Sequence, residues 1–209
     1  MNSDRNHQEA RLTLIYAVLL GVLTVGYRLV APYKLFGPGS DFAWNLMPIG
    51  ALALFVGSRL PSLWTWLLPL GAMVVSDLLL VPFYAAQGSA SISWDSTPFV
   101  YASFALYASI GRLVKPGIDS PLPLLGSALS GSVQFFLLTN FAVWVFGIDL
   151  AGEPYPKTPS GLINCFVMAL PFSKGTFIGD LFFTALFFAC HAALFAVVRS
   201  RSSSPQEAV

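Results

Sequence analysis

The sequence predicts an all-α membrane protein, a bundle of six transmembrane helices with one short additional helix on the outer side. Of its 209 residues, 56% are hydrophobic and only 10% are charged, and the mean hydropathy is +0.70. Soluble domains carry about 25% charged residues, so this composition cannot cover a water-facing surface. It excludes a soluble enzyme and a disordered chain, and a net charge of +1 gives no field that would attract nucleic acid.

The first two predicted helices follow a polar start. Residues 1–11 are polar, and the apolar run at 12–30 lacks a signal-peptide cleavage pattern, so we interpret it as a retained first span. The second run, 46–58, is shorter than the roughly 20 residues that a span requires, because Arg59 and Pro61 end it. It crosses the membrane only if it begins earlier in the chain or lies beside protein or thinned membrane.

The rest of the chain supplies four further spans and one short helix. The run at 161–172 is too short to span and Pro171 closes it, so we expect a separate outer helix there. The polar residues 199–209 predict a disordered cytoplasmic tail, which leaves 12–198 as a single transmembrane domain. The four spans are predicted at 63–83, 98–113, 122–146 and 177–198.

The placement of lysine and arginine predicts the orientation. Six spans put both termini on one side, and that side collects seven of the eleven basic residues. Because positive residues favour the cytoplasmic side, we expect a multi-pass protein of the cell inner (cytoplasmic) membrane with both termini in the cytoplasm. The outer connections, 31–45, 84–96 and 148–176, are then the long ones, and their length favours a functional role.

Polar side chains inside or beside the spans gather near the outer side of the predicted bundle. A polar group at membrane depth is energetically costly and therefore indicates function. We accordingly predict a substrate-binding site in which carboxylates and amides from separate segments meet aromatic walls and one positive charge. Its predicted members are Asn45, Asp77, Asn140, Trp144, Tyr155, Lys157, Asn164 and Asp180.

Several of these residues also have a purely structural interpretation. Asp180, in the first turn of the last predicted span, would stabilise the N-terminus of that helix. Asp77 would reach the interface or pair with a loop lysine. Asn140 and Trp144 lie four residues apart on one helix face, where they would form an interhelical hydrogen bond and an interfacial anchor.

Thr158, Lys157, His191 and the two cysteines bear on whether the chain could bind an anion, a metal or a cofactor. Thr158, before a proline, predicts the N-cap of the short outer helix, and the helix N-terminus beside Lys157 either holds an anion or is an ordinary cap. His191, in the last span, is expected to form a hydrogen bond within the bundle. Because no second histidine has ligand spacing and both cysteines, Cys165 and Cys190, are interpreted as small core residues, we expect no metal site and no cofactor.

Small residues four apart mark close helix contacts. Ala17 and Gly21 form such a pair on the first span, and their contact lies either within this chain or with another membrane subunit. The chain contains no P-loop and no hydrolase or metalloprotease motif, so it has no known motif for binding ATP.

Four groups of residues resemble an uncharacterised bacterial membrane family that is grouped with the S components, the substrate-binding subunits, of energy-coupling-factor transporters. They are NLMPIGALALF at 45–55, LPLGAMVVSDL at 68–78, SVQFFLLTNFAVW at 132–144, and YPKTPSGL at 155–162 with ALPF at 169–172 and GD at 179–180. The resemblance implies a six-helix subunit that captures a micronutrient, a vitamin-like molecule or a metal ion, on the outer side. It also implies docking through Ala17 and Gly21 onto a transmembrane coupling protein that is driven by separate ATPase subunits.

The leading hypothesis is therefore a membrane-embedded substrate-capture subunit that performs no covalent chemistry. Its expected partners are a small molecule or ion, membrane lipid and the coupling and ATPase subunits. One alternative is a structural or accessory subunit of a larger membrane complex, with no ligand of its own. A second alternative is a membrane enzyme in which Asp77 and Asp180 act as acid and base or bind a metal, which requires the two carboxyl groups to lie close together.

Overall fold

The computed structural model describes residues 2–30, 46–86, 88, 96–114, 120–149 and 151–202. Within these ranges the predicted fold class is confirmed, because the chain is an all-α bundle in which four helices are long and apolar enough to cross a membrane. Those four are α1, α4, α6 and α7. The described helices are α1 (Asn2–Val30), α3 (Ile49–Arg59), α4 (Ser62–Ala86), α5 (Thr97–Leu113), α6 (Pro121–Phe146) and α7 (Pro159–Ser202).

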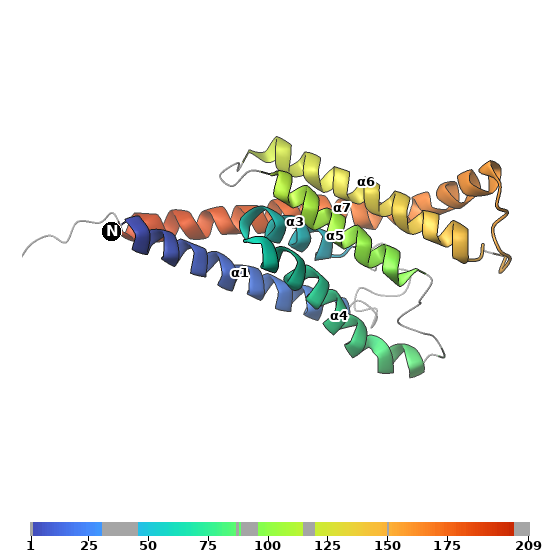
Figure 1. Ribbon diagram of the computed structural model, residues 1–209, viewed down its shortest axis with the longest axis horizontal. Helices are drawn as coiled ribbons and strands as arrows, with labels where there is room; N and C mark the ends of the chain where they lie inside the picture. The colour runs from blue at the N-terminus through green and yellow to red at the C-terminus, as the bar shows by residue number, and fades with distance from the viewer. Residues whose placement is uncertain are drawn as a thin grey trace, which may run out of the picture.

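The helices run roughly along the long axis of the molecule, and the start of α1 lies beside the end of α7 (Figure 1). There the Arg199 guanidinium of α7 lies 3.3 Å from the Glu9 carboxylate of α1. We call this the terminal end of the bundle. At the opposite end, α7 begins next to the end of α6.

The short helix α3 lies at the centre of the bundle and contacts every other described helix. It has only 11 residues, but residues 49–58 are all buried, so other helices cover its apolar surface. A segment surrounded by protein need not match the membrane thickness, which explains why this run is shorter than a lipid-facing span. It ends at Arg59 because Pro61 disfavours helical backbone in the residue before it.

Two glycines bring α3 and α5 into backbone contact. A Cβ atom at Gly57 would collide with the carbonyl oxygen of Ala108 in α5, and one at Gly111 would collide with the carbonyl oxygen of Leu54 in α3. Small residues allow such close approach between membrane helices. The contact fixes α5 against the centre of the bundle and so positions Tyr107, one residue before Ala108.

Helix α7 differs from the sequence-based expectation. It is one helix of 44 residues that contains Pro171, so the predicted separate helix at 161–172 and a disordered tail starting at 199 are both wrong. Proline is tolerated inside membrane helices, because neighbouring groups satisfy the backbone that it leaves unpaired. At 1.5 Å per residue α7 is about 66 Å long, which exceeds the hydrocarbon core of about 30 Å. Residues 203–209 of the predicted tail lie outside the described residues.

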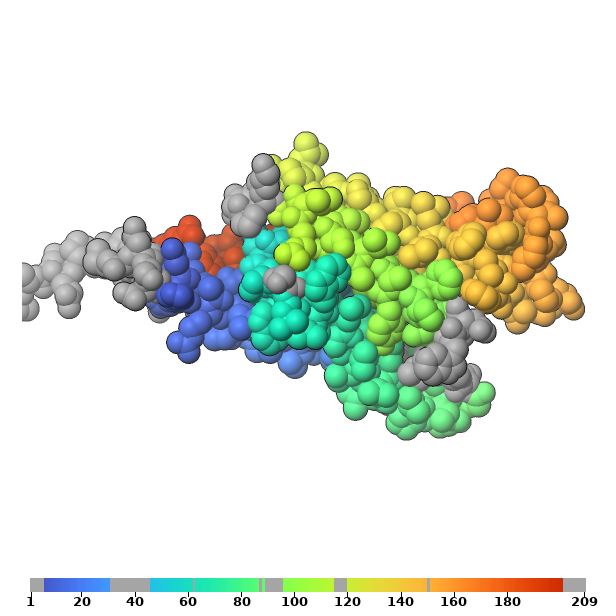
Figure 2. Space-filling view, viewed as in Figure 1, coloured from blue at the N-terminus to red at the C-terminus, as the bar shows by residue number. Residues whose placement is uncertain are grey.

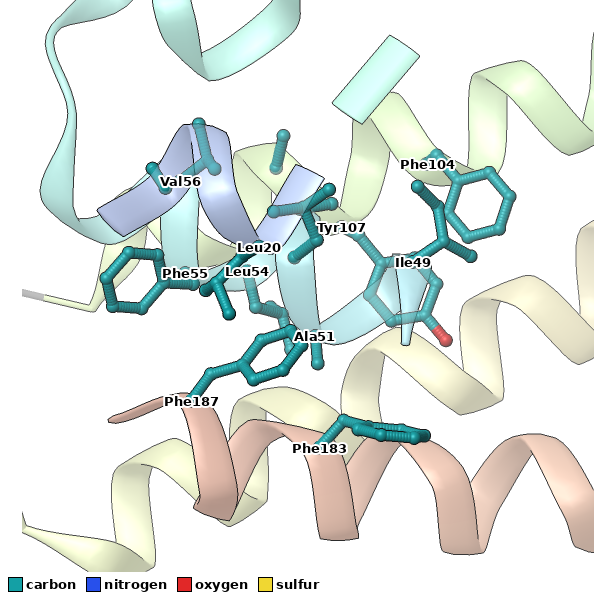
Figure 3. Packing of buried hydrophobic residues seen from close by; sticks show 14 of the residues in the cluster. Leu20, Ile49, Ala51, Leu54, Phe55, Val56, Phe104, Tyr107, Phe183 and Phe187 are labelled. Carbon is teal, nitrogen blue, oxygen red and sulfur yellow. The ribbon is translucent and has the colours of Figure 1, made fainter. Parts of the chain in front are cut away.

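The core forms where α7 packs against α3. The side chain of Phe187 points from α7 toward Ala51 of α3, and Phe183 belongs to the same buried cluster (Figure 3). Phe55 extends this cluster and lies 5.2 Å from a further α7 ring, centroid to centroid. The aromatic side chains of α7 therefore hold the central helix in place.

The outer surface of the bundle is apolar. Leu19, Val22 and Leu63 are 61%, 66% and 64% exposed, respectively. A large exposed apolar surface marks contact with lipid or another protein, which agrees with four helices of membrane-spanning length and composition. Figure 2 shows that the far ends of α4 (green) and of α6 and α7 (yellow and orange) project separately from the body of the bundle.

Candidate functional site

Asp180 lies in the interior of the bundle, where four helices meet. It belongs to α7, and its side chain is 2% exposed. Its Oδ2 atom accepts hydrogen bonds from the Tyr107 hydroxyl of α5 and from the Ser132 hydroxyl of α6, the latter at 2.7 Å. Its Oδ1 atom occupies the space that a side chain at Gly50 of α3 would fill, and Gly131 likewise leaves room for the Tyr107 ring.

This position corrects one interpretation of the sequence. Asp180 was expected in the first turn of the last helix, but α7 begins at Pro159, about 21 residues earlier. The carboxylate therefore does not stabilise the N-terminus of its own helix. Instead it lies beside Gly50, the second residue of α3, where the helix dipole of α3 is positive.

Asp77 forms a buried ion pair with Arg28, a residue that is absent from the predicted site. Arg28 Nη2 of α1 lies 2.8 Å from Asp77 Oδ1 of α4. The Tyr101 hydroxyl of α5 donates to Asp77 Oδ2 at 2.8 Å. Arg28 Nη1 donates to the Ser76 hydroxyl and lies 3.2 Å from the sulfur of Met73. Asp77 is therefore paired within the bundle through Arg28 and Tyr101, and Lys34, a lysine of the loop after α1, lies outside the described residues.

A cavity of about 200 Å³ lies between these two acidic centres. Arg28 and Asp180 both line it, and most of the remaining wall is apolar and aromatic. Ligand sites typically combine apolar walls with a few well-placed polar groups. The other lining residues are Met47, Ile49, Gly50, Met73, Val100, Phe104, Tyr107, Phe135 and Thr176.

A second cavity, of about 170 Å³, contains Asn140. It lies between α6 and α7 and shares Phe135 and Thr176 with the first cavity. Ser132 lines it and donates to Asp180, which lines the first cavity. Asn140 itself donates to the Phe136 carbonyl of its own helix at 2.8 Å. Asn140 and Asp180 therefore belong to adjoining cavities rather than to one.

Trp144 and Lys157 form a separate contact at the opposite end. Trp144 Nε1 donates to the Pro156 carbonyl at 2.9 Å, and the Lys157 ammonium donates to the Trp144 carbonyl. The same ammonium lies 5.5 Å from the Trp144 ring centroid. Neither residue lines the two cavities described above, so together they tie the 147–158 loop to the end of α6.

The other predicted members of the site are dispersed. Tyr155 lies in the same loop, where burial raises the pKa of its hydroxyl above the usual value. Asn164 is exposed on α7, and Asn45 lies outside the described residues. The predicted N-cap is confirmed, because Thr158 Oγ1 accepts a hydrogen bond from the Gly161 amide at 3.2 Å and α7 begins at the next residue after Thr158.

The small-residue pair on α1 faces the interior. Ala17 is 0% exposed, and a Cβ atom at Gly21 would lie 2.9 Å from Leu68 of α4. Close packing between α1 and α4 therefore uses Gly21, and Ala17 belongs to the buried core. In this arrangement the chain itself covers both residues, and docking of Ala17 and Gly21 onto a partner stays a prediction.

The predicted environments of His191 and Cys165 are confirmed, whereas that of Cys190 is not. His191 Nε2 lies within hydrogen-bond distance of Thr13 Oγ1, at 3.2 Å, as expected for a histidine inside the bundle. Cys165 is buried as expected, but Cys190 is exposed, so its interpretation as a core residue is wrong. Within the described part of the chain, no group of three or more His, Cys, Asp or Glu residues is arranged to hold a metal ion.

Sequence reasoning missed four residues that define the two acidic centres: Arg28, Tyr101, Tyr107 and Ser132. One signal was available, because a tyrosine hydroxyl inside an apolar span usually requires a hydrogen-bond partner. Tyr101 and Tyr107 both lie in the predicted span at 98–113. Nothing in the sequence indicated which acid each tyrosine would meet.

Comparison with known proteins places the chain in a family. The model of DUF6580, described as a family of unknown function, matches residues 7–204, which include both cavities. No curated protein and no solved structure gave a significant match. The chain therefore belongs to DUF6580, a family of unknown function.

Proposed function

We propose that this protein binds a small molecule in the cavity between Arg28 and Asp180 and serves as the substrate-capture subunit of an uptake system. The observation that carries the proposal is the cavity itself, which joins a buried acid to apolar and aromatic walls inside a membrane bundle. An ionisable residue at membrane depth is costly to maintain and marks a substrate or ion pathway by default. A purely structural bundle has no need to keep Asp180 beside an open volume.

The arrangement of the two acids favours binding over catalysis. Acid–base or two-carboxylate metal chemistry requires both carboxyl groups to be available at one site. Both oxygens of Asp77 are occupied by Arg28 and Tyr101. Asp180 is therefore the acid that can still accept a hydrogen bond from a ligand. A single carboxylate beside an apolar wall is suited to binding a small molecule.

The orientation of the bundle is part of the proposal. The cavity residue Arg28 lies in the last turn of α1, whereas the terminal end of the bundle contains the start of that helix. With both termini in the cytoplasm of the inner membrane, as the basic residues predict, the cavity would accept its ligand from the outer side. Release to the cytoplasm would require the separate coupling and ATPase subunits that the resemblance to S components implies.

The test is native mass spectrometry of gently purified protein, with denaturing analysis of any released molecule. The expected result is one small molecule per chain, lost when Val100→Phe fills the cavity and retained in Leu19→Phe, which adds the same ring to an exposed position. An empty wild-type chain that carries stoichiometric protein partners would contradict the proposal and favour the accessory-subunit alternative.

A further inference from the structure

We propose that the ligand of this cavity is a small organic monocation, an amine with an apolar body, held by Oδ1 of Asp180. This inference rests on the proposed function and adds to it the chemical class of the ligand. It follows from which carboxylate oxygens in the site are occupied, from the charges that surround them and from the size of the cavity.

The two oxygens of Asp180 have different surroundings. Oδ2 is fully engaged, because Tyr107 and Ser132 both donate to it. Among the described residues, Oδ1 accepts no hydrogen bond and lies beside Gly50, and both residues line the cavity. The two hydroxyl groups thus fix the orientation of the carboxylate and leave one oxygen at the cavity wall. A side chain that is 98% buried keeps this acceptor away from bulk water.

The charge balance of the cavity favours a positive ligand. Arg28, the one base among the described lining residues, is already neutralised by Asp77 at 2.8 Å. Asp180 has no such partner among the described residues, and a buried carboxylate without a counter-charge is expensive. An ammonium group at Oδ1 would supply that charge and a charge-assisted hydrogen bond.

The walls and the volume define the body of the ligand. Phe104 and Tyr107 lie nearly parallel with ring centroids 5.8 Å apart, and Phe135 lies 5.3 Å from Phe104. Such ring faces attract both apolar groups and cations. A cavity of about 150 Å³ accommodates benzene, so a cavity of about 200 Å³ suits an amine with a body of about one aromatic ring.

Three probes of equal size and different charge test the inference: benzylamine, benzyl alcohol and benzoate. Their affinities for the full-length protein in detergent are measured by isothermal titration calorimetry. We expect benzylamine to bind at least about tenfold more tightly than benzyl alcohol, because a hydrogen bond between charged groups is much stronger than one to a neutral group. Benzoate should not compete with benzylamine.

Two variants locate the binding. Asp180→Asn keeps the shape of the side chain but removes its charge. The affinities of this variant for benzylamine and for benzyl alcohol should therefore fall within about twofold of each other. Asp149→Asn, a carboxylate of the loop at the opposite end, should preserve the preference for benzylamine. Val100→Phe should abolish binding of all three probes. If Asp180→Asn fails to fold, the wild-type affinity ratio and the Val100→Phe variant still decide the result.

The remaining outcomes separate this inference from the proposed function. If the wild type prefers benzyl alcohol or benzoate and Val100→Phe abolishes that binding, the inference of a cationic ligand is overturned. The cavity would still be a binding site. Probes that do not distinguish the wild type from Val100→Phe would overturn both.

Discussion

Arg28 Nη2 of α1 lies 2.8 Å from Asp77 Oδ1 of α4, and the two side chains are only 17% and 9% exposed. The pair joins two helices beside the cavity and neutralises the only base among the described residues that line it. Tyr101 completes the arrangement by donating to the second oxygen of Asp77. The ion pair therefore acts both as a link between helices and as the element that sets the charge of the cavity.

Breaking this ion pair should destabilise the bundle in a non-additive way. Arg28→Met and Asp77→Leu each leave one buried charge without its partner, and each should lower the free energy of unfolding by about 3 kcal/mol. The double variant leaves no orphaned charge and should lose clearly less than the sum of the two. Denaturant unfolding in detergent, followed by circular dichroism, measures all four proteins. Strict additivity would show that the pair does not interact.

The hydroxyl of Tyr107 should stabilise the protein, whereas that of Tyr27 should not. Tyr107 donates to Asp180, so Tyr107→Phe should cost about 1.5–3 kcal/mol, the usual range for a hydrogen bond to a charged group. Tyr27 has a buried hydroxyl with no hydrogen-bond partner among the described residues, so Tyr27→Phe should be neutral or stabilising. Thermal unfolding of the two variants provides the comparison. Equal losses would contradict a specific role for the Tyr107 hydroxyl.

The glycines between α3 and α5 should be intolerant of any side chain. Gly57→Ala would make a methyl group collide with the Ala108 carbonyl oxygen. We therefore expect the free energy of unfolding to fall by about 1–3 kcal/mol. Gly71 and Gly126 are helical glycines with no atom within 4 Å of the added Cβ position. Alanine at either position should be neutral or stabilise by up to about 1 kcal/mol, because it favours the helix. Melting temperatures of the three variants in detergent test this contrast.

The proposed orientation predicts opposite labelling of the two ends of the bundle. In a background with Cys165→Ala and Cys190→Ala, Glu153→Cys should react with a membrane-impermeant maleimide added to intact cells. Arg199→Cys, at the terminal end, should react only after the membrane is permeabilised. Both positions are exposed in the structure, so access to the reagent depends on the side of the membrane alone. The reverse pattern would place the termini outside and contradict capture from the outer side.

Part of the candidate site could be predicted from the sequence. A carboxylate in an apolar run is conspicuous because lipid cannot solvate it, and this reasoning selected Asp77 and Asp180, which are both buried in the structure. The same reasoning placed Trp144 and Lys157 in the site, but they form their own contact in the loop. Residue type indicates that a side chain needs a partner, but it does not indicate which partner.

The sequence by itself determined that this protein is a helical membrane bundle. Only helices satisfy their own backbone hydrogen bonds within a short local segment, so long apolar runs dictate both the environment and the secondary structure. The tertiary structure alone decided that Arg28 meets Asp77, 49 residues away, and that Tyr107 meets Asp180, 73 residues away. It also decided that α7 continues through Pro171. These outcomes depend on how helix faces pack and on where glycines permit close approach, and such contacts between distant segments leave no local pattern in the chain.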